Sequence, residues 1–138
     1  MVTAPSQVSD DDQRRALILV VNDVEETRDA LEKLLTPDGY RVHLARGEGD
    51  AVRSARLDAP ALILLSLSGT QSDWIAAATR IREGAELSAS VPVVLFCVDA
   101  LPEGAEVEIA GSIYLTRPDN FDQLRRFLRR LLRTAGRA

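Results

Sequence analysis

Short apolar runs alternate with helical stretches along most of this chain, and this alternation constrains the fold more than any other feature. The first run, Leu17–Val21, is continuous and rich in β-branched residues, as expected for a strand that is buried on both faces of a sheet. Between the runs, apolar residues recur every three or four positions, which is the spacing of an amphipathic helix. Strands that alternate with helices in this way predict an α/β fold, in which a parallel sheet with right-handed crossovers carries helices on both faces.

The pattern predicts five strands and four well-defined helices. The expected strands are residues 17–21, 41–44, 61–65, 93–96 and 113–116. The expected helices are residues 25–35, 47–57, 74–81 and 121–132. Trp74 lies on the apolar stripe of the third of these helices, where a core position is expected.

The segment between the fourth and fifth strands is poor helix material. Pro102 and Gly104 disfavour a helix there, since proline and glycine cost roughly 3 and 1 kcal/mol in a helix interior. We therefore expect a short or distorted fourth helix, over Glu106–Ala110 only. The alternative is that Pro102 starts a helix at its first turn.

The composition fits one domain. The 138 residues, 46% apolar and 28% charged, are enough to bury a core. Residues 1–15 are polar and acidic and predict a flexible tail, residues 16–134 form the expected domain, and residues 135–138 form a second tail. A net charge of −4 gives no general reason to expect nucleic-acid binding. One cysteine suits a reducing cytoplasm, and the chain lacks the apolar stretch that a signal peptide or a membrane span requires.

The expected functional site lies beyond the carboxyl ends of the strands, because doubly wound sheets bind and react there. The residues at these positions form the candidate pocket: Asn22, Asp23, Ser66, Cys97 and Arg117.

These positions resemble the signature of the receiver domain of response regulators. Val20–Asp23 is similar to the motif in which two adjacent acids follow strand one, with Asn22 in place of the first acid. Ser66 follows the third apolar run, where the family has its phosphoacceptor aspartate. Cys97 ends strand four, where threonine or serine is usual, and Arg117 precedes a proline at the place of the usual lysine. The separations between consecutive positions are also receiver-like: 43 residues from Asp23 to Ser66, 31 from Ser66 to Cys97 and 20 from Cys97 to Arg117.

The resemblance covers about residues 16–134 and implies a flavodoxin-like sheet of five parallel strands in the order 2-1-3-4-5. It also implies a role in bacterial two-component (phosphorelay) signal transduction, with a histidine kinase or another signalling protein as partner. Tyr114 stands at the position of the family's switch aromatic on strand five. Receivers commonly pair through helix four, strand five and helix five, so a homodimer through that face is a further expectation.

The departures from the signature remove the family's usual chemistry. A serine cannot form an acyl phosphate, and its hydroxyl is a poor nucleophile without a neighbouring base. Mg²⁺ is held by carboxylates, and Asp23 is the pocket residue that still carries one. The planar fork of Arg117 does not reproduce the point charge of a lysine. We therefore expect no enzymatic activity, no Mg²⁺ and no other cofactor, and a stand-alone pseudo-receiver that acts by phosphorylation-independent protein–protein interaction.

Structural roles for the same residues stay open. Ser66 fits a strand end that bonds nearby backbone, and Cys97 fits a small buried hydrophobe. Arg117 and Asp23 fit a structural ion pair. The alternative function is a small-molecule or anion-sensing module, with the ligand near Asn22, Ser66 and Arg117.

The last expected helix has an apolar stripe and an arginine-rich opposite side. Its arginines are Arg125, Arg126, Arg129, Arg130 and Arg133. They fit either an ordinary solvated face or a partner surface that meets acidic proteins. A membrane role is not expected, because the core needs the apolar stripe.

Overall fold

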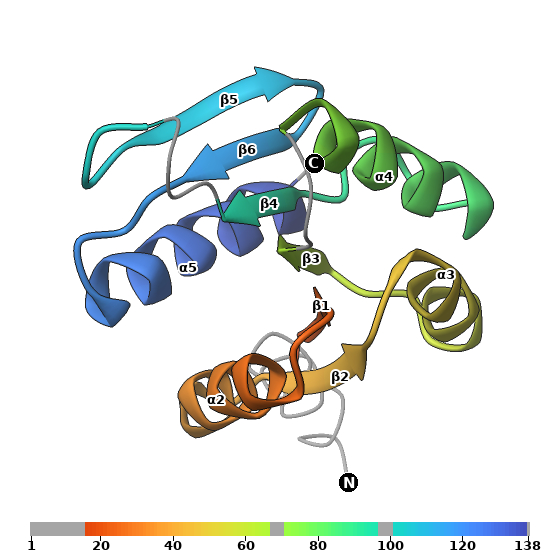
Figure 1. The fold of residues 1–138 in the computed structure, drawn as a ribbon, viewed down its shortest axis with the longest axis horizontal. Helices are drawn as coiled ribbons and strands as arrows, with labels where there is room; N and C mark the ends of the chain where they lie inside the picture. The colour runs from red at the N-terminus through yellow and green to blue at the C-terminus, as the bar shows by residue number, and fades with distance from the viewer. Residues whose placement is uncertain (1–15, 67–70, 97–100, 138) are drawn as a thin grey trace, which may run out of the picture.

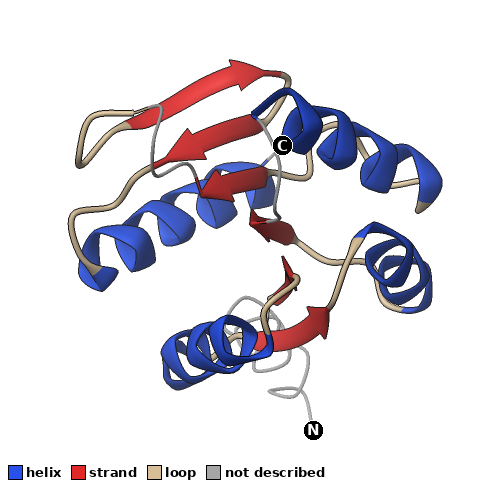
Figure 2. Cartoon of the chain, viewed as in Figure 1, coloured by secondary structure: helices blue, strands red, loops and turns tan. Residues whose placement is uncertain are grey.

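The computed structural model describes residues 16–66, 71–96 and 101–137 and shows an α/β fold (Figures 1 and 2). The predicted fold class is confirmed: a central sheet in the order β2-β1-β3-β4-β6-β5 lies between two layers of helices. The strands β2, β1, β3, β4 and β6 are parallel to one another. The expected acidic tail, residues 1–15, lies outside the described ranges.

Five of the six strands follow the expected runs closely, and β5 was not expected. They are β1 (Leu17–Asn22), β2 (Arg41–Ala45), β3 (Leu62–Ser66), β4 (Val93–Phe96), β5 (Glu106–Ala110) and β6 (Ile113–Thr116). The helices are α2 (Glu25–Leu35), the short 3₁₀ helix η1 (Thr36–Asp38), α3 (Glu48–Leu57), α4 (Gln71–Gly84) and α5 (Phe121–Arg137). α4 and α5 are longer than expected, and α5 continues into the segment that was expected to be a second tail.

The prediction of a fourth helix over Glu106–Ala110 was wrong, because this segment is strand β5 and pairs antiparallel with β6. The reason is in the local pattern: Val107 and Ile109 alternate with Glu106 and Glu108, a period of two that fits a strand and not a helix. The hairpin lies at the edge of the sheet, outside β6 (Figure 1).

The core consists of two apolar clusters, one on each face of the sheet. α2 and α5 cover one face, and α3 and α4 cover the other (Figure 2). β1 contributes to both clusters and is buried along its full length, as its continuous apolar run predicts. Trp74 is partly buried and packs against the cluster under α3 and α4, at the border of the core in which it was expected. Within the described ranges, none of the helices has the length and hydropathy needed to cross a membrane.

The turn before β5 depends on Gly104, which has a left-handed φ of +85°. A Cβ there would lie 3.3 Å from the carboxylate oxygen Oδ2 of Asp119. We expect Gly104→Ala to lower the free energy of unfolding by about 1–2 kcal/mol, measured by urea denaturation. Gly111→Ala is the matched control in the β5–β6 turn, because its Cβ would meet no atom within 4 Å. The control should change stability by less than about 0.5 kcal/mol, and equal losses in the two variants would contradict this account.

Candidate functional site

The sheet brings two of the predicted pocket residues together. Asn22 and Ser66 are register partners at the carboxyl ends of β1 and β3. Asp23 follows directly and is exposed, and Arg117 follows the end of β6. Cys97 lies outside the described residues. Among the described residues, no three His, Cys, Asp or Glu side chains form a cluster that could hold a metal ion, and the expectation that Mg²⁺ does not bind stays a prediction.

The side chain of Asn22 is engaged with its own chain. It is only 4% exposed, and its Oδ1 accepts a hydrogen bond of 2.7 Å from the backbone N–H of Val24. The guanidinium of Arg28 donates to the carbonyl oxygen of Asn22 at 2.8 Å. The bond to Val24 forms a side-chain turn that leads from β1 into α2, and the bond from Arg28 ties the end of β1 to α2. An aspartate could make the same turn, so the asparagine keeps the local structure while it removes the charge.

Arg117 is bonded to the loop that precedes β5. One guanidinium nitrogen, NH1, donates to the carbonyl oxygen of Leu101 at 2.9 Å. The backbone of Arg117 also pairs with this loop, since its N–H donates to Ala105 and its carbonyl oxygen accepts from Gly104. The ion pair of Arg117 with Asp23 stays a prediction. At least one N–H donor of the Arg117 guanidinium thus helps to position the β5–β6 hairpin.

Tyr114 on β6 is half-buried against α5. Its ring meets that of Phe127 edge-on, with centroids 5.8 Å apart and an angle of 83° between the planes. Burial raises the pKa of Tyr114, and the charge of Glu108 on β5 adds to the rise. The guanidinium of Arg130 lies 5.5 Å from the centroid of the Phe127 ring. The aromatic position is therefore in contact with α5 and, through Phe127, with its basic side.

Arg125 holds α5 to the segment between α2 and β2. Its guanidinium donates two hydrogen bonds to the carboxylate of Asp38, at 2.8 and 2.5 Å. The side chain of Asp38 is 11% exposed, so water screens this pair poorly. The hydrogen bonds from Arg125 lower the pKa of Asp38, although burial opposes the shift. Arg125 was predicted as part of a partner surface, and the structure gives it a structural role.

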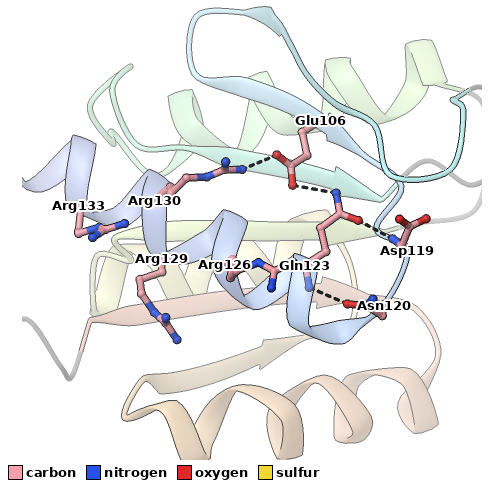
Figure 3. Close-up of a pocket in the computed structure, with 8 residues that line it drawn as sticks. All are labelled: Glu106, Asp119, Asn120, Gln123, Arg126, Arg129, Arg130 and Arg133. Carbon is pink, nitrogen blue, oxygen red and sulfur yellow. Dashed lines mark hydrogen bonds and ion pairs between the residues drawn. The ribbon is translucent and has the colours of Figure 1, made fainter.

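Arg130 holds the opposite side of α5 to the hairpin. It forms an ion pair with Glu106 on β5. Gln123 donates to the second oxygen of Glu106 at 3.1 Å and to the carbonyl oxygen of Gly104 at 2.8 Å (Figure 3). The sequence could not identify this partner, because Glu106 was assigned to a helix.

Three of the predicted arginines remain between these two flanks: Arg126, Arg129 and Arg133 are exposed. No ion pair is recorded for them in the part of the chain that the structure describes. They line, with Arg130, an open cavity of about 510 Å³, which we call the α5 groove. The other residues that line the α5 groove are Glu106, Asp119, Asn120 and Gln123.

Arg129 lies on the side of the groove that is closer to α2. In Figure 3 its guanidinium points away from Glu106. Burial raises the pKa of Tyr40, which precedes β2, and the charge of Arg129 opposes that rise. The positive charge of α5 thus extends from the groove toward Tyr40 and Asp38, next to α2.

The fold matches solved structures of receiver domains. NtrX from Brucella abortus aligns with a TM-score of 0.69 at 24% identity, over 88% of this chain and 28% of the NtrX chain. The N-terminal domain of a response regulator/sensory box/GGDEF 3-domain protein from Carboxydothermus hydrogenoformans aligns with a TM-score of 0.65 at 23% identity, over 87% of this chain and 96% of that domain.

Chemotaxis protein CheY4 from Vibrio cholerae gives a TM-score of 0.60 at 17% identity, over 85% of this chain and 98% of CheY4. This chain has the receiver-domain fold. It spans little more than a quarter of NtrX but nearly the whole of the other two chains. No protein-family model matches the sequence. At sequence identities of 17–24%, the likeness to receiver domains shows the fold and not the function.

The Asp38–Arg125 pair predicts a dependence of stability on pH. Because the pKa of Asp38 is lowered in the folded protein, its contribution is present above the ordinary value of 3.8 and is lost as the pH falls further. We expect Asp38→Asn to lower the free energy of unfolding at neutral pH, and the difference from the native chain to shrink below about pH 3.8.

The matched control is Asp122→Asn. Asp122 pairs with the same arginine at 3.2 Å, but its side chain is 73% exposed and its pair is screened by water. Acid and urea denaturation of both variants checks the prediction. A constant difference between native and Asp38→Asn protein across the pH range would contradict the assignment.

Proposed function

We propose that this protein is a pseudo-receiver of bacterial two-component signalling, which acts by protein–protein contact without being phosphorylated. The observation that carries the proposal is the pairing of Asn22 with Ser66 at the carboxyl ends of β1 and β3. A receiver-domain fold is kept here, while two acids of the receiver signature are replaced by an amide and a hydroxyl.

The chemistry of the two side chains supports this reading. Transfer of a phosphoryl group to a receiver needs a carboxylate nucleophile and carboxylates that hold Mg²⁺. The amide of Asn22 is neutral and already accepts the N–H of Val24. Ser66 is half-buried at the end of a strand, and a serine there needs a base to become nucleophilic. Asp23 is the one pocket carboxylate left among the positions of the signature.

The α5 groove is the surface that we assign to a partner. Arg126, Arg129 and Arg133 are exposed and have no ion pair within the described ranges, so they can meet acidic side chains of another protein. Complementary charge speeds association and fixes orientation. A histidine kinase or another signalling protein with an acidic face is the proposed class of partner.

The hairpin changes the pairing face that was expected from the receiver likeness. With β5 in place of the expected helix, that face consists of β5, β6 and α5. In the described residues β5 stands where helix four was expected, so a homodimer on that side would pair through the edge strand β5.

The test uses the cytoplasmic domains of histidine kinases from the same organism as binding probes, in biosensor measurements with and without Mg²⁺ and beryllofluoride. We expect binding that does not change with beryllofluoride. Reversing Arg126, Arg129 and Arg133 to glutamate should weaken it about tenfold or more, equivalent to about 1.4 kcal/mol.

The control variant reverses two arginines on α3, Arg53 and Arg56, which are exposed and lie on the opposite face. This variant should bind like the native chain. Binding that needs beryllofluoride would contradict the proposal, as would a triple variant that binds as well as the native chain. Beryllofluoride or phosphate that binds at Asn22 and Ser66 would instead favour the anion-sensing alternative.

A further inference from the structure

The outer edge of β5 has no neighbouring strand within the described residues. β5 is the last strand of the sheet and pairs with β6 on one side only (Figure 1). Backbone N–H and C=O groups alternate between the two sides of an antiparallel strand, so part of the backbone of β5 faces outward. No proline interrupts residues 103–117, and every residue of the hairpin therefore keeps its N–H donor. An unpaired strand edge of this kind is a template for a further strand.

One face of β5 is apolar and open. Val107 lies opposite the buried Leu115 of β6, so its side chain is on the side of the sheet that α3 and α4 cover. Ile109 is the extra residue of the bulge that faces Ile113, which belongs to the same apolar cluster. Val107 is 42% exposed and Ile109 is 37% exposed. The helices on this side therefore leave the apolar face of the outermost strand partly uncovered.

The two acids of β5 are on the opposite face and are bonded within the molecule. Glu106 forms an ion pair with Arg130 of α5. Glu108 accepts a hydrogen bond of 3.1 Å from the backbone N–H of Ser112 in the β5–β6 turn. Charged side chains protect an edge strand from pairing when they stand in the way of another strand. These bonds direct the carboxylates toward α5 and the turn, while the exposed Glu108 still gives the edge a negative charge.

A second copy of this chain does not match this edge. An isologous pair of β5 strands is antiparallel, with the twofold axis at one residue, and residues opposite each other share a face. An axis at either acid sets that acid opposite its own copy, and an axis at Val107 sets Glu106 opposite Glu108 twice. An axis at Ile109 falls at the bulge, where the ladder is irregular. Like charges directly opposite each other destabilise a sheet, so the edge favours a strand of opposite charge.

We propose that the outer edge of β5 binds an extended segment of another protein in which basic and apolar residues alternate. The segment adds a strand to the sheet, with apolar side chains beside Val107 and Ile109 and a lysine or arginine beside Glu108. Main-chain hydrogen bonds supply the affinity, and the alternating side chains supply the specificity. The proposal does not depend on the proposed function, because it requires neither the candidate pocket nor the exposed arginines of α5.

The experiment titrates the ¹⁵N-labelled native chain with a blocked synthetic peptide that contains Lys-Val-Lys-Ile-Lys, followed by backbone-amide NMR shifts. We expect saturable shifts in β5 and β6 and none in β2, the other edge strand of the sheet. A fully N-methylated peptide should bind at least about tenfold more weakly, because it has no backbone N–H to donate. A peptide with glutamate in place of lysine should also bind at least about tenfold more weakly, because its acids meet Glu108.

Three variants of the protein complete the design. Val107→Lys should weaken binding of the lysine peptide about tenfold or more, because a charge replaces the apolar side chain. Glu108→Lys should reverse the preference, so that the glutamate peptide binds more tightly than the lysine peptide. The matched control is Glu83→Lys, the same change of charge at an exposed position on α4, and this variant should bind like the native chain.

An absence of saturable shifts at millimolar peptide would overturn the proposal, as would equal binding of the lysine and glutamate peptides. Shifts in β2 as large as those in β5 would also overturn it, since the peptide would then bind any strand edge. Shifts in β5 that appear with rising protein concentration alone would show a second copy as the occupant. Circular dichroism identifies a variant that has not folded, and the peptides test the native chain without any variant.

Discussion

The structure depends first on the burial of β1 between β2 and β3. Parallel neighbours on both sides satisfy the backbone of β1, and apolar clusters on both faces enclose its side chains. This central position brings Asn22 beside Ser66 and starts α2 at the same edge of the sheet. The candidate pocket and the orientation of the charged helices therefore follow from one buried strand.

The arginines of α5 illustrate how one charged stripe can serve two purposes. Arg125 and Arg130 lie on opposite flanks and bind Asp38 and Glu106, which fixes α5 between the α2–β2 connection and the hairpin. The arginines between them, Arg126, Arg129 and Arg133, are exposed and form no ion pair within the described residues. The arginine side of α5 is therefore neither wholly a solvated face nor wholly a binding surface, because Arg125 and Arg130 have structural roles.

The sequence predicted most of the sheet, because continuous apolar runs have few other uses in a chain of this size. The prediction failed at Glu106–Ala110. Pro102 and Gly104 indicated only that a helix there would be short, whereas the alternation of acidic and apolar residues from Glu106 to Ile109 is the pattern of a strand. The candidate pocket could be listed from strand ends alone. The use of the Asn22 amide in a turn, and the pairing of Arg125 with Asp38 across 87 residues of sequence, depend on tertiary geometry that local patterns do not contain.

The central claim is that loss of the acids at Asn22 and Ser66 leaves the pocket chemically silent. The most direct measurement is a titration of the native chain and of the Asn22→Asp/Ser66→Asp variant with Mg²⁺ and beryllofluoride, followed by backbone-amide NMR shifts. The account predicts no saturable shifts at Asp23, Ser66 and Arg117 in the native chain, and saturable shifts in the variant, whose carboxylates supply the missing ligands. Saturable shifts in the native chain would contradict the account.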